Sequence, residues 1–203
     1  MKLIDSSTEY KILEAAKTEF LEFGLYGARM QNIANRAGIN KALLHYYFRN
    51  KEKLFDKVFE SALERYFSNM DIMSDDRLDF KEKVHGLANR FLDFLNEYPQ
   101  MALFLIKEVS ANQVLFIEKV DKNLKGHKTL LSALLDAQQK GEVSLENPMV
   151  FFVQLISMCT YPFVAKPLFA VIAERNETSW NSDSLTELRA SIHSFIDHQL
   201  NLA

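Results

Sequence analysis

The sequence predicts an all-α protein, and three observations carry that prediction. The 203 residues include only six glycines and four prolines, whereas 48% are hydrophobic and sixteen are phenylalanine. Valine and isoleucine nowhere alternate with polar residues over a length that would suggest a strand. Apolar residues recur instead at helical spacing along most of the chain. A chain of this length can bury a substantial core in one or two domains.

The first helix is expected over residues 7–23. Ser6, Ser7 or Thr8 can cap its N-terminus, because their hydroxyls accept hydrogen bonds from free backbone N–H groups. Gly24 would end it. The apolar stripe of this helix consists of Ile12, Ala16, Phe20 and Phe23. It predicts a bracing helix that packs against the segment that follows.

Two short helical patterns come next, separated by residues 37–39. Gly38 fits a tight turn, since glycine reaches positive φ without a steric penalty. Ala34 is small enough to let a second helix cross the first, and Leu44 would fill the angle between them. This spacing is typical of the helix-turn-helix, whose second helix enters the major groove of DNA.

Charge supports this interpretation. Residues 24–53 contain six lysines and arginines and one glutamate, a net charge of +5, whereas the whole chain carries −3. The rest of the chain therefore carries −8. A basic block on an otherwise acidic protein is typical of a phosphate-binding face.

The run from Ile12 to Phe55 resembles the DNA-binding region of the TetR family of bacterial transcriptional regulators. The resemblance rests on the leading helix ILEAAKTEFLEFG, on Ala37-Gly38-Ile39, on the stretch from Lys41 to Phe48, and on RNKEKLF from residue 49. It covers about a quarter of the chain. Ala28 departs from the family, which often has a threonine capping the second helix there, so that cap is expected to come from elsewhere or to be weak.

The candidate DNA-contacting residues combine helix phase with this resemblance. Helix phase places Lys41, Ala42, Leu43, His45 and Tyr46 on or near the groove-facing part of the second helix. There Lys41 can donate to guanine or phosphate, and Ala42 and Leu43 can touch a thymine methyl. The resemblance adds Arg29, Gln31 and Lys51, of which Lys51 is a candidate phosphate clamp at a helix N-terminus. Tyr47 completes the set.

Several of these residues have a structural alternative. Tyr46 and Tyr47 can be buried packing aromatics, Tyr47 more readily, because helix phase turns it inward with Leu44 and Phe48. His45 can be a surface residue, and Arg36 is expected to face solvent between the helices.

The remaining chain is expected to be helical throughout. A long helix at about residues 52–70 connects the predicted helix-turn-helix domain at residues 1–53, here called the DNA reader, to the rest of the chain. A loop at residues 74–77 follows it. Further helices are expected from Asp79, from Pro99 and from Asn112 to Lys140, the last bent at Gly126 and closed by Gly141. The predicted division is a helix-turn-helix domain at residues 1–53 and a larger helical effector-binding and dimerisation domain at residues 54–203.

Asn147 and Pro148 start a strongly apolar segment, in which Lys166 is the one charge in twenty-six residues. Its length raises the possibility of a membrane span. Polar interruptions and the absence of a second span favour instead a helix that meets its own core and a partner subunit. Pro162 and Pro167 are expected to kink or break it.

A last helix is expected from Ser182 to about Leu200. The TetR resemblance implies that the final two helices form a four-helix bundle with a second copy of the chain. A homodimer presents two readers to a two-fold symmetric operator, with half-sites on the order of 34 Å apart.

The resemblance also implies a small-molecule pocket among the C-terminal helices. Its candidate lining is Phe91, Phe94, Met101, Phe104, His127, Met158, Cys159 and Tyr161. Such a stripe of aromatic and methionine residues is also what ordinary core packing gives. A ligand would be apolar or aromatic, with few polar anchors.

Two other classes of protein compete with a regulator. An enzyme is disfavoured, because the five histidines show no metal-ligand spacing and no nucleophile motif or Gly-rich phosphate loop occurs, so neither a catalytic site, a metal nor a cofactor is expected. A helical interaction module with a vestigial helix-turn-helix is disfavoured by the basic block, because phosphate contacts supply most non-specific DNA affinity.

The expected function is a ligand-responsive, homodimeric transcriptional regulator. The resemblance alone makes it a repressor rather than an activator. The single Cys159 and the absence of an apolar signal segment at the N-terminus suggest a cytoplasmic location.

Overall fold

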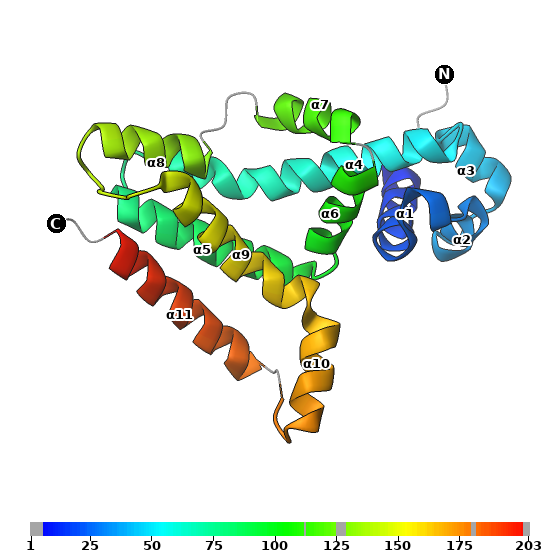
Figure 1. The fold of residues 1–203 in the computed structure, drawn as a ribbon. Coiled ribbons are helices and arrows are strands. Elements are labelled where there is room, and N and C mark those ends of the chain that lie inside the picture. Colours follow the sequence, from blue (N-terminus) through cyan, green and yellow to red (C-terminus); the bar gives the residue numbers. More distant parts are fainter. Residues whose placement is uncertain (1–5, 112, 125–128, 180–181, 201–203) are drawn as a thin grey trace. The chain divides into compact units, whose positions relative to one another are not determined.

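The computed structural model describes residues 6–111, 113–124, 129–179 and 182–200. Within these residues every regular element is helical, which confirms the all-α fold class (Figure 1). The helices group into two compact units. Unit 1 comprises residues 1–65 and 103–120, and unit 2 comprises residues 66–102 and 121–203. The predicted division of roles at residue 53 concerns function and stays a prediction.

Unit 1 contains α1 (Ser6–Gly27), α2 (Met30–Arg36), α3 (Lys41–Tyr47) and most of α4 (Lys51–Ser68). Helix α1 packs on α2, and α2 packs on α3. Phe20 of α1 meets Phe55 of α4 edge-on, with ring centroids 5.0 Å apart. The apolar stripe predicted for the first helix is buried at Ile12, Ala16 and Phe20. These side chains build the small core that supports the helix-turn-helix.

The end of α1 differs from the prediction. Gly24 does leave the helical conformation, with φ 66° and ψ −178°, but a short turn then carries α1 on to Gly27. The expected stripe fails at Phe23, whose side chain is 47% exposed. Phe23 is the last residue before the break at Gly24.

Most of α6 (Met101–Ala111) and α7 (Gln113–Leu124) also belongs to unit 1. Residues 112–140 were predicted as one bent helix, and this prediction was wrong. The structure has two helices there, because α8 (Leu130–Gln139) starts with its own cap, in which the Thr129 hydroxyl accepts from the Ser132 amide at 3.1 Å. Gly126, the predicted bend, lies outside the described residues.

Unit 2 is built around α5 (Phe80–Glu97). Asp79 caps α5 in a reciprocal pair with Glu82, as each side chain accepts the backbone N–H of the other. Helix α5 contacts the 3₁₀-helix η1 (Asn69–Ser74), α9 (Pro148–Val164) and α11 (Ser182–Gln199), and α8 packs on α9 (Figure 1). The core of unit 2 lies where these helices meet, with Leu87, Phe91 and Leu95 of α5 almost completely buried.

The apolar segment that starts at Pro148 is broken, as the prolines predicted. Helix α9 ends at Val164, and α10 (Lys166–Arg175) leaves it at an angle of 68°. Pro162 stays inside α9, whereas Pro167 lies in the first turn of α10. The break is at Ala165, because Pro167 has no N–H to continue the helical bonds of α9 and its ring clashes with the carbonyl four residues earlier. None of the side chains of α10 is buried.

Within the described residues no single helix has the length and apolarity of a membrane span. Only α9 and α10 taken together meet that test, as a bent pair.

A polar network joins α5 to α11. The His85 ring bonds Asp197 at 3.0 Å, and Lys81 pairs with the same carboxylate at 2.8 Å. Next to it, His193 donates to the side-chain oxygen of Asn89 at 2.9 Å, and its ring centroid lies 4.5 Å from that of His85. Burial lowers the pKa of His193, and the neighbouring His85 and Arg189 lower it further against the opposing charge of Asp197.

This network predicts a loss of stability in mild acid. Because the folded state lowers the pKa of His193, the unfolded chain binds more protons between the folded pKa and about 6.5. The free energy of unfolding therefore has its full value above that range, where His193 is neutral in both states, and it falls as the pH drops from 7 towards 5. Asp197, whose pKa is also lowered, contributes only at more acid pH. Urea denaturation at pH 7 and pH 5 should therefore show a smaller pH dependence for His193→Gln than for the native chain. The same replacement at the exposed His198 is the control, and an equal pH dependence in all three proteins would contradict the prediction.

Candidate DNA-binding interface

The turn between α2 and α3 has the geometry that residues 37–39 predict. Gly38 has φ 68°, and the amide of Ile39 bonds the carbonyl of Ala34 at 3.0 Å. The Gly38 amide bonds the carbonyl of Asn35 at 3.2 Å. These two bonds close the C-terminus of α2 in a Schellman motif, whose left-handed residue is normally glycine. The turn therefore fixes the direction in which α3 leaves α2.

The recognition helix α3 starts at a capped N-terminus. The Asn40 side chain accepts from the Leu43 amide at 2.8 Å. Only Leu44 of α3 is buried, and Phe48 closes the helix beneath it. The remaining predicted contacts of α3 lie on its outer surface: Lys41, Ala42, Leu43, His45 and Tyr46 are all exposed. The structure thus places six of the nine predicted DNA contacts on one short helix, and five of these six are exposed.

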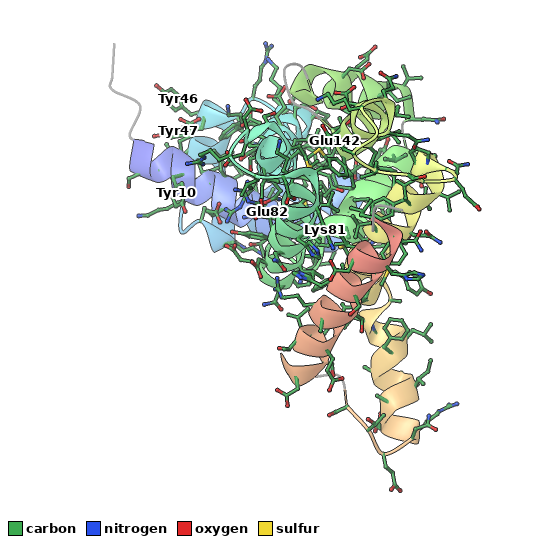
Figure 2. The ribbon with its side chains drawn as sticks, turned by 90° about the vertical axis from the view of Figure 1, so that its left-hand side faces the viewer. Tyr10, Tyr46, Tyr47, Lys81, Glu82 and Glu142 are labelled. Atoms are coloured by element: carbon green, nitrogen blue, oxygen red, sulfur yellow. The ribbon has the colours of Figure 1, made fainter. Side chains whose placement is uncertain are left out.

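The two tyrosines of α3 differ in environment. Tyr46 is 69% exposed and projects from unit 1, whereas Tyr47 is half-buried (Figure 2). Their rings meet edge-on with centroids 5.7 Å apart. Tyr47 can therefore hold the ring of Tyr46 in place while contributing part of its own edge to the surface.

The predicted contacts outside α3 have partners within unit 1. Arg29 and Gln31 are exposed, and the Gln31 amide donates to the Asn35 side chain at 2.9 Å. The Lys51 amine donates to the backbone carbonyls of Ala28 at 3.2 Å and Tyr26 at 3.4 Å. Lys51 thus ties the first turn of α4 to the connection between α1 and α2.

A buried carboxylate that sequence reasoning missed holds α2 on α1. The Glu19 side chain is completely buried. One oxygen accepts from the Arg29 amide at 3.2 Å and from the Asn32 side chain at 2.9 Å. The other accepts from Arg36 at 3.2 Å. Glu19 therefore satisfies a free N–H at the start of α2 and pairs with the charge at its end.

This arrangement answers the question raised by Ala28. Arg29 is the N-cap residue of α2, and its own side chain makes no capping bond. Glu19 supplies the missing acceptor from the neighbouring helix. Arg36 is exposed, as expected, but its guanidinium also pairs with Glu19 and, at 3.1 Å, with Glu22. A signal for Glu19 was present in the sequence, since it lies on the apolar stripe of α1 one residue before Phe20.

The candidate ligand-lining residues fall into different environments. Phe91 and Phe94 pack on Tyr66 in unit 2, with ring centroids 5.0 and 6.1 Å from that ring. Phe104 belongs to unit 1, where it contacts Phe55 and Phe59. Met101 and Cys159 are buried, Met158 is partly exposed, and Tyr161 is 55% exposed. His127 lies outside the described residues.

Tyr66 and Cys159 form a second feature that the sequence did not reveal. Burial raises the pKa of the Tyr66 phenol to about 12, and the nearby Cys159 thiol adds to the effect. Burial likewise raises the pKa of Cys159 to about 12, partly opposed by Arg189. Both groups are therefore neutral at pH 7 and can act as hydrogen-bond donors in the interior of unit 2. Among the residues that the structure describes, no group of three or more histidine, cysteine, aspartate or glutamate side chains is placed to hold a metal ion.

Comparison with known proteins agrees with this geometry. Residues 12–58 match the family of bacterial regulatory proteins of the tetR type. The chain is 25% identical over 168 residues to the HTH-type transcriptional repressor SCO4008 of Streptomyces coelicolor, covering 82% of this chain and 83% of that one. It is 27% identical over 130 residues to the uncharacterised HTH-type transcriptional regulator YhgD of Bacillus subtilis, covering 64% of this chain and 66% of that one.

The fold also matches solved structures. The transcriptional regulator FadR of Bacillus subtilis, solved in complex with stearoyl-CoA, superposes with a TM-score of 0.67 at 18% identity, covering 95% of this chain and all of that one. At this identity the match supports the predicted architecture, a helix-turn-helix domain followed by a larger helical domain.

Proposed function

We propose that this chain, a TetR-family transcriptional regulator by its DNA-binding domain, is a repressor that binds a palindromic operator as a homodimer and releases it when a small molecule binds. The observation that carries the proposal is the exposed face of α3 on a turn fixed by Gly38, within the segment that matches the family. Basic residues surround this face, so phosphate contacts can supply the non-specific part of the affinity. A regulator of this kind acts in the cytoplasm and has no catalytic activity.

The proposed DNA contacts are those of the exposed surface. Lys41, Ala42, Leu43, His45 and Tyr46 of α3 enter the major groove, flanked by Arg29 and Gln31 of α2. Tyr47 and Lys51 support them from partly buried positions. A helix of seven residues reads few bases, which favours two copies of the reader on a two-fold symmetric site.

The second copy is proposed to bind through α9 and α11. The exposed side chains of α9 recur every three or four residues on one side, at Val150, Val153, Ser157 and Tyr161. Helix α11 lies beside α9 and exposes the small residues Ala190, Ser191 and Ser194. Small side chains let helices approach closely, and exposed valines favour a buried contact. The pair therefore suits a four-helix bundle with its counterpart.

The effector is proposed to bind in the interior of unit 2. Phe91, Phe94 and Met101 offer apolar contact, and the neutral Tyr66 and Cys159 offer the polar anchors. An apolar or aromatic molecule with one or two hydrogen-bonding groups fits this set. Stearoyl-CoA, bound by the structural relative, shows that an apolar chain is one class to screen.

The proposed function is tested by titrating the purified protein against the DNA flanking its own gene, at several salt concentrations. Binding to a palindromic stretch at least a hundredfold tighter than to random DNA, and weakening steeply with salt, is the expected result. If the protein binds the flanking DNA no better than random DNA, genomic fragments are selected for binding next. If no genomic fragment is bound more tightly than random DNA, the competing interpretation, a helical interaction module, is favoured.

Tyr46→Ala is expected to weaken operator binding about tenfold while leaving binding to random DNA almost unchanged. The reason is its exposed position on α3, where the ring and hydroxyl can reach base edges. Fluorescence anisotropy with operator and random DNA measures both affinities. Tyr10→Ala, an exposed tyrosine on α1, is the control. Unchanged operator affinity in the Tyr46 variant would reject the role.

Lys51→Ala is expected to weaken binding to all DNA sequences alike and to reduce the salt slope by about one. Its amine already bonds two carbonyls, and a phosphate oxygen would become its third acceptor. Lys53→Ala removes an exposed lysine from the same turn and is the matched comparison. A salt slope equal to that of the native protein would leave Lys51 a purely structural role.

A further inference from the structure

A cavity of about 700 Å³ lies at the N-terminal end of α5, entirely within unit 2. Its wall combines η1 and the first turn of α5, the last turns of α8 with the residues that follow, and the end of α11. None of the proposed DNA contacts or effector contacts lines it. Its volume is in the range of pockets that hold small organic ligands.

The interior of this α5 cavity is apolar. Met73 of η1, Ala137 of α8, Val143 after α8 and Leu200 after α11 all line it, and each is less than a tenth exposed. They come from three separate stretches of the chain, since Ala137 and Val143 lie only six residues apart, so the surface they form depends on the packing of unit 2. A surface of this kind binds the hydrocarbon part of a ligand.

Six charged side chains also line the cavity, and most are already engaged. The Asp79 carboxylate caps α5 by accepting from the Glu82 amide at 2.8 Å. The Lys81 amine pairs with Asp197 of α11 at 2.8 Å. Figure 2 labels Lys81 on α5 and Glu142 after α8, two of the six. The carboxylate of Glu142 lies 3.9 Å from the amine of Lys140, the upper limit for an ion pair.

Lys83 stands apart from the other charged lining residues. It is partly buried, and within the described residues its amine makes no hydrogen bond and no ion pair. The charge of Lys83 helps to lower the pKa of Asp75, but it is the smallest of several causes. A lysine amine beside an apolar surface, with its three N–H donors available, favours a ligand that carries an anionic oxygen.

We propose that the α5 cavity binds an amphipathic carboxylate, with its hydrocarbon part against Met73, Ala137, Val143 and Leu200 and its carboxylate on Lys83. Lys140, the residue that follows α8, also lines the cavity and carries a second positive charge, 3.9 Å from the Glu142 carboxylate. Because the cavity includes the end of α11, occupancy stabilises the contact between α5 and α11. Any effect on operator binding rests on the proposed function, whereas the binding itself does not.

Isothermal titration with sodium decanoate tests the site, with decan-1-ol as the uncharged probe of the same chain length. Lys83→Met keeps an apolar stem and removes the amine. The expected result is a Kd for decanoate at least tenfold higher in the variant, with the weaker binding of decanol unchanged. Lys57→Met, at an exposed lysine of α4 in unit 1, should bind decanoate like the native chain. Equal decanoate affinity in the native and Lys83 proteins would overturn the proposal.

Methyl NMR locates the bound ligand independently of affinity. Decanoate should shift the methyl signal of Met73, which lines the cavity, and leave that of Met30 in unit 1 in place. A shift confined to Met158 would place the ligand among the effector contacts instead and would overturn the α5 site. Neither measurement involves DNA, so failure to find an operator would reject the proposed function without affecting this result.

Discussion

Replacing Glu19 with alanine is expected to lower the free energy of unfolding by about 3 kcal/mol. The carboxylate is completely buried and accepts three hydrogen bonds. Without it, the Arg29 amide and the Asn32 side chain lose their acceptor, and Arg36 loses its buried partner. Urea denaturation followed by circular dichroism measures the change.

Glu22 provides the matched control for this prediction. It pairs with the same Arg36 at 3.1 Å but is 54% exposed, and such surface pairs contribute less than about 1 kcal/mol. Glu22→Ala should therefore cost only a few tenths of a kcal/mol. Glu19→Gln should fall between the two alanine variants, because the amide oxygen can still accept from Arg29 and Asn32 while the charge is lost. Equal losses in Glu19→Ala and Glu22→Ala would refute the buried bracing role of Glu19.

Val153→Asp is expected to convert the proposed dimer into a monomer and to reduce operator affinity at least a hundredfold. Val153 is 48% exposed at the centre of the proposed contact face of α9. An interface of this type would place two unpaired carboxylates in an apolar contact, which costs several kcal/mol. A monomer would then hold one half-site with one reader. Sedimentation equilibrium and anisotropy on the same samples measure the two effects.

Val114 is the site of the matched control substitution for Val153→Asp. It is a valine of α7, in unit 1, and is 70% exposed. Val114→Asp introduces the same charge at a site outside α9 and α11, so the dimer and operator binding should both persist. If Val153→Asp remains dimeric at micromolar concentration, the second copy binds elsewhere.

The helix-turn-helix was accessible from sequence because its determinants are local. Gly38 fixes a backbone conformation, and the spacing to Leu44 fixes the angle between two helices within eleven residues. Glu19 was not recognised, because its partners lie ten to seventeen residues away and a charge on an apolar stripe has no local explanation. Its value appears only when α1 and α2 are packed together.

Other differences have equally specific causes. The separation of α7 from α8 depends on the cap at Thr129, a signal that the surrounding helical spacing of leucines obscured. The candidate effector contacts illustrate another difficulty, since Phe91 and Phe104 show the same apolar periodicity but belong to different units. Periodicity identifies which residues are buried and says little about which of them meet. The α5 cavity was missed for this reason, as its walls come from three distant segments, residues 73–83, residues 133–143 and Leu200.

The two bonds of Lys51 have a mechanical consequence. Its amine holds the carbonyls of Tyr26 and Ala28, and Glu19 holds the residue that follows them. The side chains of Lys51 and Glu19 therefore connect α1, α2 and the first turn of α4 across the short segment between α1 and α2. A force applied along α4 would then move the whole reader as one rigid body instead of tilting α3 within it. Each helix-turn-helix would then keep its shape in the DNA-bound and DNA-free states. The affinity for the operator would depend on the positions of the two helix-turn-helix units in the dimer.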